Sequence, residues 1–178
     1  MSRNTVRFSI DGLADLEKSL DNLSKAVGRN VLRRSLRAAA QPMADKARSL
    51  APVDEGDLRD SIIVGSKLNG SERKKHRKLT AEERSSIELF VGPSYLKGAG
   101  GRHGHLVEFG TAPHINKGRF AGSEHPGTAP QPFMRPAFDT EAQPTIERLK
   151  PILALEIEKA AKRTAARAAR AARKAAGG

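Results

Sequence analysis

The chain has 178 residues and contains no cysteine, so disulfides and thiol chemistry are excluded. Hydrophobic residues make up 38 %, which suits one modest domain with an appendage rather than a large core. The formal net charge of +12 is concentrated near the C-terminus, where seven basic residues lie between Lys159 and Lys174 without an acidic one. A basic segment of this kind suits nucleic acid, an acidic partner or a membrane surface.

Targeting and membrane signals are missing from the sequence. The N-terminus has no apolar signal-peptide core. No run approaches the ~18 apolar residues that a membrane span needs. We therefore expect a soluble protein that is made in the cytoplasm and has no membrane partner.

The N-terminal part predicts a strand and two helices. Residues 6–10 alternate between apolar and polar side chains, which is the period of a half-buried strand. Leucine and valine at spacings of three and four over residues 13–27 predict an amphipathic helix that Gly28 interrupts. A second helix is expected over residues 32–50, with a kink at Pro42. Both apolar faces are interpreted as core; coiled-coil partnering is the alternative.

The middle of the chain predicts a β-hairpin with a long connection. Residues 62–64 follow an acidic turn and form one strand, and residues 87–91 alternate in a second strand that can pair with it antiparallel. The connection, residues 69–84, is longer than a tight hairpin needs and holds five Lys or Arg within eight positions. We interpret it as a flexible, solvated projection, with nucleic-acid contact as the alternative.

A long, glycine-rich connection is expected next, over residues 94–129. Residues 98–105 contain four glycines in GAGGRHGH but neither a dinucleotide nor a Walker pattern, so we expect a mobile loop that cradles no phosphate. A short helical turn or strand follows and is stopped by Gly110. Residues 112–129 are predicted to be a loop, either functional or disordered.

The segment PQPFMRPAFD, residues 130–139, is the most specific string in the chain. Its three prolines fix φ and withhold backbone donors, so we expect no helix before Asp139-Thr140. Phe133 and Phe138 either fill this chain's own core as the helix begins, or the proline-bounded loop before them meets a neighbouring subunit. The helix that follows carries apolar residues at helical spacing up to Ile157, with a bend at Pro151.

Beyond residue 158 the sequence is alanine with arginine and lysine, which predicts an exposed helical extension over residues 159–178. At 100° per residue, its cations fall within an arc of about 140°. This cationic stripe consists of Lys159, Lys162, Arg163, Arg167, Arg170, Arg173 and Lys174.

No catalytic, cofactor or metal site is predicted. His103, His105 and His114 have no ligand-spacing signature and are interpreted as solvated. Glu108 has no evident nucleophile or paired acid, so we expect an ion pair or a hydrogen bond to backbone rather than a general base. The expected fold is α+β. A small, mainly antiparallel sheet packs against two N-terminal helices and a long C-terminal helix in residues 1–158, with long loops.

Three motifs occur in order: ARSLAPVDEGDLRDSI (residues 47–62), VGP followed by HLVEFGT (residues 91–111), and the proline-rich segment. This order resembles tailed-bacteriophage neck proteins, the tail-completion or head–tail joining family of tail components, over residues 10–158. Glu55 stands where the family typically has Thr. Residues 69–84 look like an insertion, and residues 159–178 lie outside the shared pattern.

The resemblance implies a non-enzymatic virion protein that assembles as a six-fold ring at the head–tail junction. Its expected partners are further copies of itself, a head-side connector or stopper protein, a tail terminator or tail tube protein, and the DNA in the lumen. The positions matching the family motifs are implied to have structural or subunit-contact roles. They are Pro52, Gly56, Leu58, Ser61, Ile62, Gly92, Glu108, Phe109, Gly110, Thr111, Pro132, Phe133, Arg135, Pro136 and Ala137.

The candidate subunit or partner contacts combine these motifs with the loops: Glu108, Phe109, Phe120, Phe133, Met134, Arg135 and Phe138. Arg135 is expected to pair with a carboxylate such as Glu108, within the chain or across the interface. The alternative function is nucleic-acid binding through the cationic stripe. Because no aromatic residue lies among these cations, contact with the phosphate backbone is expected rather than base stacking. An acidic partner protein is an equally physical target.

Overall fold

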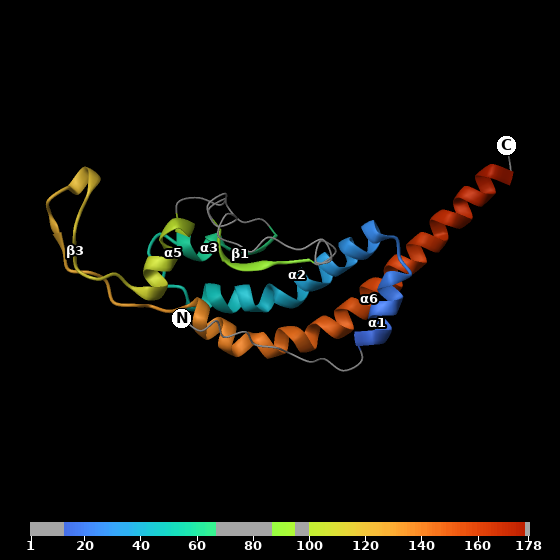
Figure 1. Ribbon diagram of the computed structural model, residues 1–178, viewed down its shortest axis with the longest axis horizontal. Helices are drawn as coiled ribbons and strands as arrows, with labels where there is room; N and C mark the ends of the chain where they lie inside the picture. Colours follow the sequence, from blue (N-terminus) through green and yellow to red (C-terminus); the bar gives the residue numbers. More distant parts are fainter. Residues whose placement is uncertain (1–12, 67–86, 95–99, 177–178) are drawn as a thin grey trace.

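The computed structural model describes residues 13–66, 87–94 and 100–176 (Figure 1). The fold is α+β, as predicted, with two small antiparallel sheets and α6 packed along α2. The elements are α1 (Leu13–Asp21), α2 (Lys25–Leu50), α3 (Asp57–Ser61), β1 (Ile62–Gly65), β2 (Phe90–Pro93), α5 (Gly100–Phe109), β3 (His114–Ile115), the 3-10 helix η3 (Gly118–Phe120), β4 (Glu124–His125) and α6 (Met134–Ala176).

The core lies along the contact between α2 and α6 and consists of two clusters. One surrounds Phe133 and includes a stripe of small residues on α2, Ala40, Ala44 and Ala47. Alanine side chains on one helical face allow another backbone to come close, so α6 and β1 can both pack on α2. The other cluster joins Val31 of α2 to residues 153–160 of α6, with leucines of α1 packed at its edge.

The sequence predicts a break between the two N-terminal helices at Gly28. The break lies instead at residues 22–24. Gly28 lies inside α2 and is buried. A Cβ built there would lie 3.5 Å from the carbonyl oxygen of Leu20, which is an ordinary van der Waals contact, so the last residue but one of α1 lies directly against this position. Pro42 also lies within α2, and the helix continues through it to Leu50.

The predicted antiparallel pairing is confirmed, but the second strand runs over Phe90–Pro93 rather than over residues 87–91. β1 pairs antiparallel with β2, with Val64 opposite Val91 and Ile62 opposite Pro93. Ile62 and Val64 both face inward and are buried. The predicted strand over residues 6–10 and the basic connection over 69–84 lie outside the described residues.

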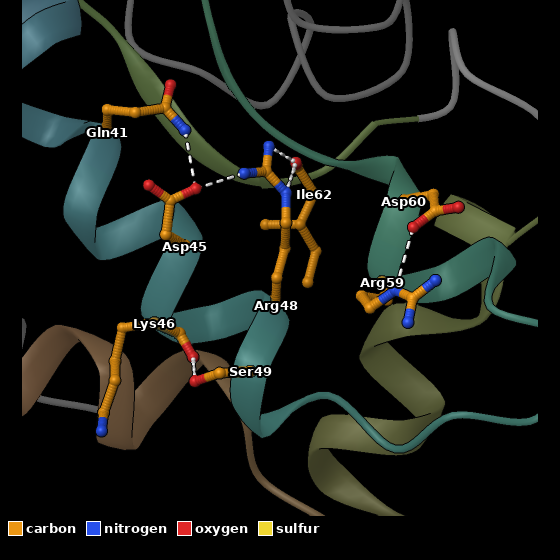
Figure 2. Close-up of polar contacts among 8 residues, drawn as sticks. All are labelled: Gln41, Asp45, Lys46, Arg48, Ser49, Arg59, Asp60 and Ile62. Atoms are coloured by element: carbon orange, nitrogen blue, oxygen red, sulfur yellow. Dashed lines mark hydrogen bonds and ion pairs between the residues drawn. The ribbon is translucent and has the colours of Figure 1, made fainter.

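Arg48 in the last turn of α2 fixes β1 on the helix. Its Nε and Nη2 donate hydrogen bonds of 3.0 and 2.6 Å to the carbonyl oxygen of Ile62, and its Nη1 pairs with Asp45 (Figure 2). The Ile62 carbonyl at the strand start therefore receives two charge-assisted bonds. Figure 2 also shows Arg59, whose ion pair is with its sequence neighbour Asp60.

The prediction of a mobile loop over residues 98–105 is wrong for the described part, because α5 begins at Gly100. Gly101 and Gly104 are buried. A Cβ at Gly104 would lie 2.7 Å from Cγ of Pro93 and 3.3 Å from Cδ1 of Leu58. The glycines therefore serve close packing of a helix, and this tertiary contact outweighs their low helix propensity.

The last helix, α6, has 43 residues and contains Pro144 and Pro151. It follows a curved path along α2 and then extends beyond the rest of the chain (Figure 1). The helical extension expected from residue 159 onward is continuous with it up to Ala176. The division into a domain over 1–158 and an extension over 159–178 stays a prediction.

Candidate assembly site

The N-terminus of α6 is capped by a carboxylate that is remote in sequence. Glu108 of α5 accepts backbone hydrogen bonds from Phe133 and Met134 at Oε2, both 2.8 Å, and from Arg135 at Oε1, 2.9 Å. Its side chain is buried. The first N–H groups of a helix have no partner within the helix and carry its positive dipole end. Glu108 therefore supplies the charge and the acceptors that this helix start needs.

The ionisation of Glu108 reflects the same contacts. Burial alone would raise the pKa of this carboxyl group. The backbone N–H groups of Met134, Phe133 and Arg135, together with the charge of Arg135, outweigh burial and hold the pKa below its ordinary value. The predicted hydrogen bonding of Glu108 with backbone is thus observed, with the carboxylate as acceptor. Both of its oxygens are occupied by this chain's own donors, which fits a structural acceptor rather than a general base.

The sequence predicts that the last helix starts after Asp139-Thr140, but α6 begins at Met134. The cap by Glu108 explains this earlier start. Pro136 falls in the first turn, where its missing N–H costs no helical bond. The three prolines therefore do not exclude an early helix, because proline in a first turn is compatible with one.

Among the candidate contact residues closest to the cap, Phe133 is buried, Met134 is half-buried and Arg135 is exposed. Phe133 is fully buried in the core around α2 and Met134 packs against that core, which agrees with the interpretation that Phe133 fills its own chain's core. Arg135 meets Glu108 through its backbone N–H. Within the described part of the chain, its guanidinium forms no ion pair, so the predicted side-chain pairing with Glu108 is not observed there.

Three of the candidate aromatics are on the surface. Phe109 is 75 %, Phe120 67 % and Phe138 43 % exposed. Phe109 and Phe138 line a groove of about 430 Å³ at the junction of α5 and α6, beside Pro93, Met134 and Arg135. Exposed rings of this size on neighbouring elements are typical of an interaction surface.

Phe120 lies on a projecting β-hairpin, residues 111–128, that we call the arm (Figure 1). Residues 112–129 were expected to be a loop, either functional or disordered; within them β3 pairs antiparallel with β4, with His114 opposite His125. The two imidazole rings stack with centroids 4.9 Å apart. Ile115 on β3 is 63 % exposed, so the arm presents apolar side chains away from the core.

The base of the arm is tightly closed. Thr111 and Thr128 exchange two backbone hydrogen bonds of 2.9 and 3.0 Å. Gly110 and Gly127 flank this pair with φ of +68° and +86°, and a Cβ on either would lie 2.4 Å from a carbonyl oxygen of the opposite strand. Only glycine fits such a conformation at this distance. Gln131 N–H then donates to the Val107 carbonyl, 2.9 Å away, which ties the returning strand to α5.

The cationic stripe occupies the free end of α6. Residues 161–176 are all exposed, and the helix stands apart from the other elements there (Figure 1). Lys159 and Lys162 pair with Glu156 and Glu158 on the same helix. The five cations further along make no ion pair within residues 13–66, 87–94 and 100–176. They are Arg163, Arg167, Arg170, Arg173 and Lys174.

The histidines considered as metal ligands are dispersed over two elements. His103 and His105 belong to α5, whereas His114 stacks on His125 in the arm. The described ranges contain no group of three or more side chains arranged to hold a metal ion. Among the described helices, none is long and apolar enough to cross a membrane.

The fold and its surface define an α+β scaffold with an anchored long helix, a projecting apolar arm and a cationic end. Residues 14–110 match the family model described as "Bacteriophage HK97-gp10, putative tail-component". The match covers more than half of the chain, and the chain belongs to this family of bacteriophage tail components. The arm, the proline-rich segment and α6 lie beyond the matched residues. No curated protein and no solved structure matches the chain.

Proposed function

We propose that the protein is a structural virion subunit that forms a closed ring at the head–tail junction, around the DNA path. The ring has six copies and performs no reaction. Its partners are other copies of the chain, a head-side connector or stopper protein, and a tail terminator or tail tube protein. The observation that carries the proposal is the exposure of large apolar side chains on the arm and on the neighbouring groove, Ile115, Phe109 and Phe120.

Two properties of the chain support this proposal. The chain belongs to a family of phage tail components. An isolated two-stranded hairpin is marginally stable in water, and exposed apolar side chains that gather on neighbouring elements mark interaction surfaces. An arm held at its base by paired threonines and two conformationally demanding glycines is suited to reach a neighbouring subunit.

Electron microscopy and multi-angle light scattering of the purified full-length protein, alone and with the connector and tail partners, test the proposal. A ring of defined mass is expected in at least one of these mixtures. A strict monomer that ignores both partners, and whose deletion leaves particle assembly intact, would refute it.

A second candidate function is contact with DNA phosphates through the cationic stripe. The observation that favours it is the row of five exposed cations that have no ion pair in the described chain, from Arg163 to Lys174. Phosphate contact by five cations gives a log–log slope of affinity against salt of about −4.5, compared with about −6 if Lys159 and Lys162 also left their glutamates. An acidic partner protein is the competing target.

Truncation after Ala161 tests this second function without disturbing the core, because Ile157 and Ala160 are the last buried residues of α6. Affinity for a random-sequence duplex is measured by fluorescence anisotropy at several salt concentrations. The truncated protein is expected to lose binding and the salt slope. Equal affinity of both proteins would contradict DNA contact by this helix, and binding of an acidic partner without DNA binding would favour the protein target.

A further inference from the structure

We infer that the tip of the arm, residues 117–120, docks in an acidic groove of a second copy of this chain. The groove lies between residues 52–58 and α5 and has a volume of about 420 Å³. This inference rests on the proposed self-assembly and names its contact. The same contact, repeated from copy to copy, would build the ring.

The tip carries two cations and an aromatic ring in a preorganised turn. Lys117, Arg119 and Phe120 are all exposed, and Cζ of Arg119 lies 5.9 Å from the Phe120 ring centroid. Hydrogen bonds within the tip hold its shape, with Asn116 N–H donating to the Ser123 carbonyl at 2.9 Å and Ser123 Oγ to the Phe120 carbonyl at 2.8 Å. A ligand that is already ordered loses little conformational entropy on binding.

The groove has an apolar lining and an acidic edge. Leu58 and Val107 are half-buried within it, and Val53 at its margin is 62 % exposed. Asp54, Glu55 and Asp57 line the same groove, and all three are exposed. It therefore offers an apolar surface for a ring and a cluster of negative charge for cations.

The distribution of charge favours the acidic groove over the groove beside Phe109 and Phe138 as the docking site for the tip. The tip brings Lys117 and Arg119 to a site with three carboxylates, which is the complementary pattern that steers and orients protein association. Each groove has one histidine in its lining, His103 in the acidic groove and His105 in the groove beside Phe109 and Phe138. The second groove adds the cation Arg135, and its one carboxylate, Glu108, is occupied by the α6 cap. A cationic tip finds no free counter-charge there.

The arrangement in space makes the contact intermolecular. The arm extends away from α3 and α5, so its tip lies apart from the groove of its own chain (Figure 1). The tight base at Gly110 and Gly127 opposes folding back. A tip on one copy that meets a groove on the next is a heterologous contact, and such contacts generate rings when the rotation closes.

Charge reversal tests the inference. One variant reverses the tip (Lys117→Glu with Arg119→Glu), and another reverses the groove (Asp54→Lys with Glu55→Lys). All four side chains are exposed, so both variants are expected to fold, as checked by circular dichroism. Each variant alone is expected to self-associate roughly a hundredfold more weakly in sedimentation velocity, because like charges then face each other.

Mixing gives the decisive result. In an equimolar mixture of the two variants, the reversed tip of one can bind the reversed groove of the other. The native tip of the second variant can likewise bind the native groove of the first, so assembly is expected to return. Phe120→Ala should weaken association by roughly thirtyfold, as expected for one central aromatic anchor. Arg167→Glu with Arg170→Glu is the matched control for the tip reversal, because it lowers the net charge by the same amount on the cationic stripe and should leave self-association unchanged.

The outcomes separate this inference from the proposed function. If wild-type protein forms rings and both reversals do too, or if each reversal abolishes rings and the mixture does not restore them, the tip–groove contact is wrong while the ring stands. If removal of residues 162–178 prevents self-association and tip reversal does not, the cationic stripe occupies the groove, and the inference is overturned. If the wild type stays monomeric with all partners present, both proposals fail.

Discussion

Removing the charge of Glu108 is expected to loosen the start of α6 and with it the core around Phe133. Glu108→Gln keeps one acceptor oxygen but places an NH₂ group against backbone N–H donors and removes the anion from the helix N-terminus. Loss of the charge–dipole interaction and of one satisfied buried donor amounts to about 2–4 kcal/mol. Glu108→Ala leaves all three donors of residues 133–135 without this acceptor, and we expect it to cost at least as much.

The effect of Glu108 depends on pH in a defined direction. Its pKa is lowered in the folded protein, so its stabilisation is complete above the unfolded pKa of about 4.3 and is lost as pH falls through the folded value. Wild type should therefore lose stability below about pH 4–5 with a contribution that Glu108→Gln lacks. The difference between the two proteins should shrink from pH 7 to pH 3, because the stabilisation by ionised Glu108 is lost progressively below its unfolded pKa.

Urea denaturation followed by circular dichroism at pH 7 and at pH 3 measures both effects. Glu147→Gln is the matched control, since Glu147 is an exposed carboxylate on the same helix whose recorded bond is to Gln143. It should change the free energy of unfolding by less than about 0.5 kcal/mol. If Glu108→Gln unfolded at the same urea concentration as wild type at both pH values, the capping argument would be refuted.

Three other substitutions, one of them with a matched control, test the packing. Arg48→Ala should lower the free energy of unfolding by about 2 kcal/mol, because the Ile62 carbonyl loses two charge-assisted bonds. Arg59→Ala, in an exposed ion pair, is the control and should change it by under about 0.5 kcal/mol. Equal effects of the two substitutions in urea melts would contradict this prediction. Ser35→Ala should raise the melting temperature, because this fully buried hydroxyl has no partner in the described structure and costs about 1 kcal/mol or more; a lower melting temperature would argue against this. Gly104→Ala should cost about 1–3 kcal/mol through its clash with Pro93, and unchanged stability would show that α5 can shift away.

Local patterns in the sequence predicted the elements whose own residues determine them. The apolar periodicity of α2, the pairing of β1 with β2 and the alanine-rich end of α6 all follow from spacing and propensity. The start of α6 could not be predicted in this way, because its capping carboxylate, Glu108, is 25 residues before Phe133 in sequence. Long-range partners of this kind leave no periodic signal.

Glycine-rich stretches were misread for a similar reason. The glycines of residues 100–105 indicated a loop. In the structure they belong to α5, and Gly104 lets this helix approach Pro93 and Leu58. The sequence predicts only a loop for the arm, because β3 and β4 have two residues each, too few for an alternating pattern. Its shape depends on Gly110 and Gly127, and the meaning of those glycines is visible only when the opposing carbonyl oxygens are placed.

The uninterrupted course of α6 has a mechanical consequence. A helix of 43 residues has a contour length of about 65 Å, and this one joins the Glu108 anchor directly to the cationic end. A reorientation of about 5° at the anchored turn would displace the far end by about 5–6 Å if the rod stayed stiff. Binding of a neighbouring molecule near α5 would therefore shift the position of the cationic end of α6, because the helix would act as a lever.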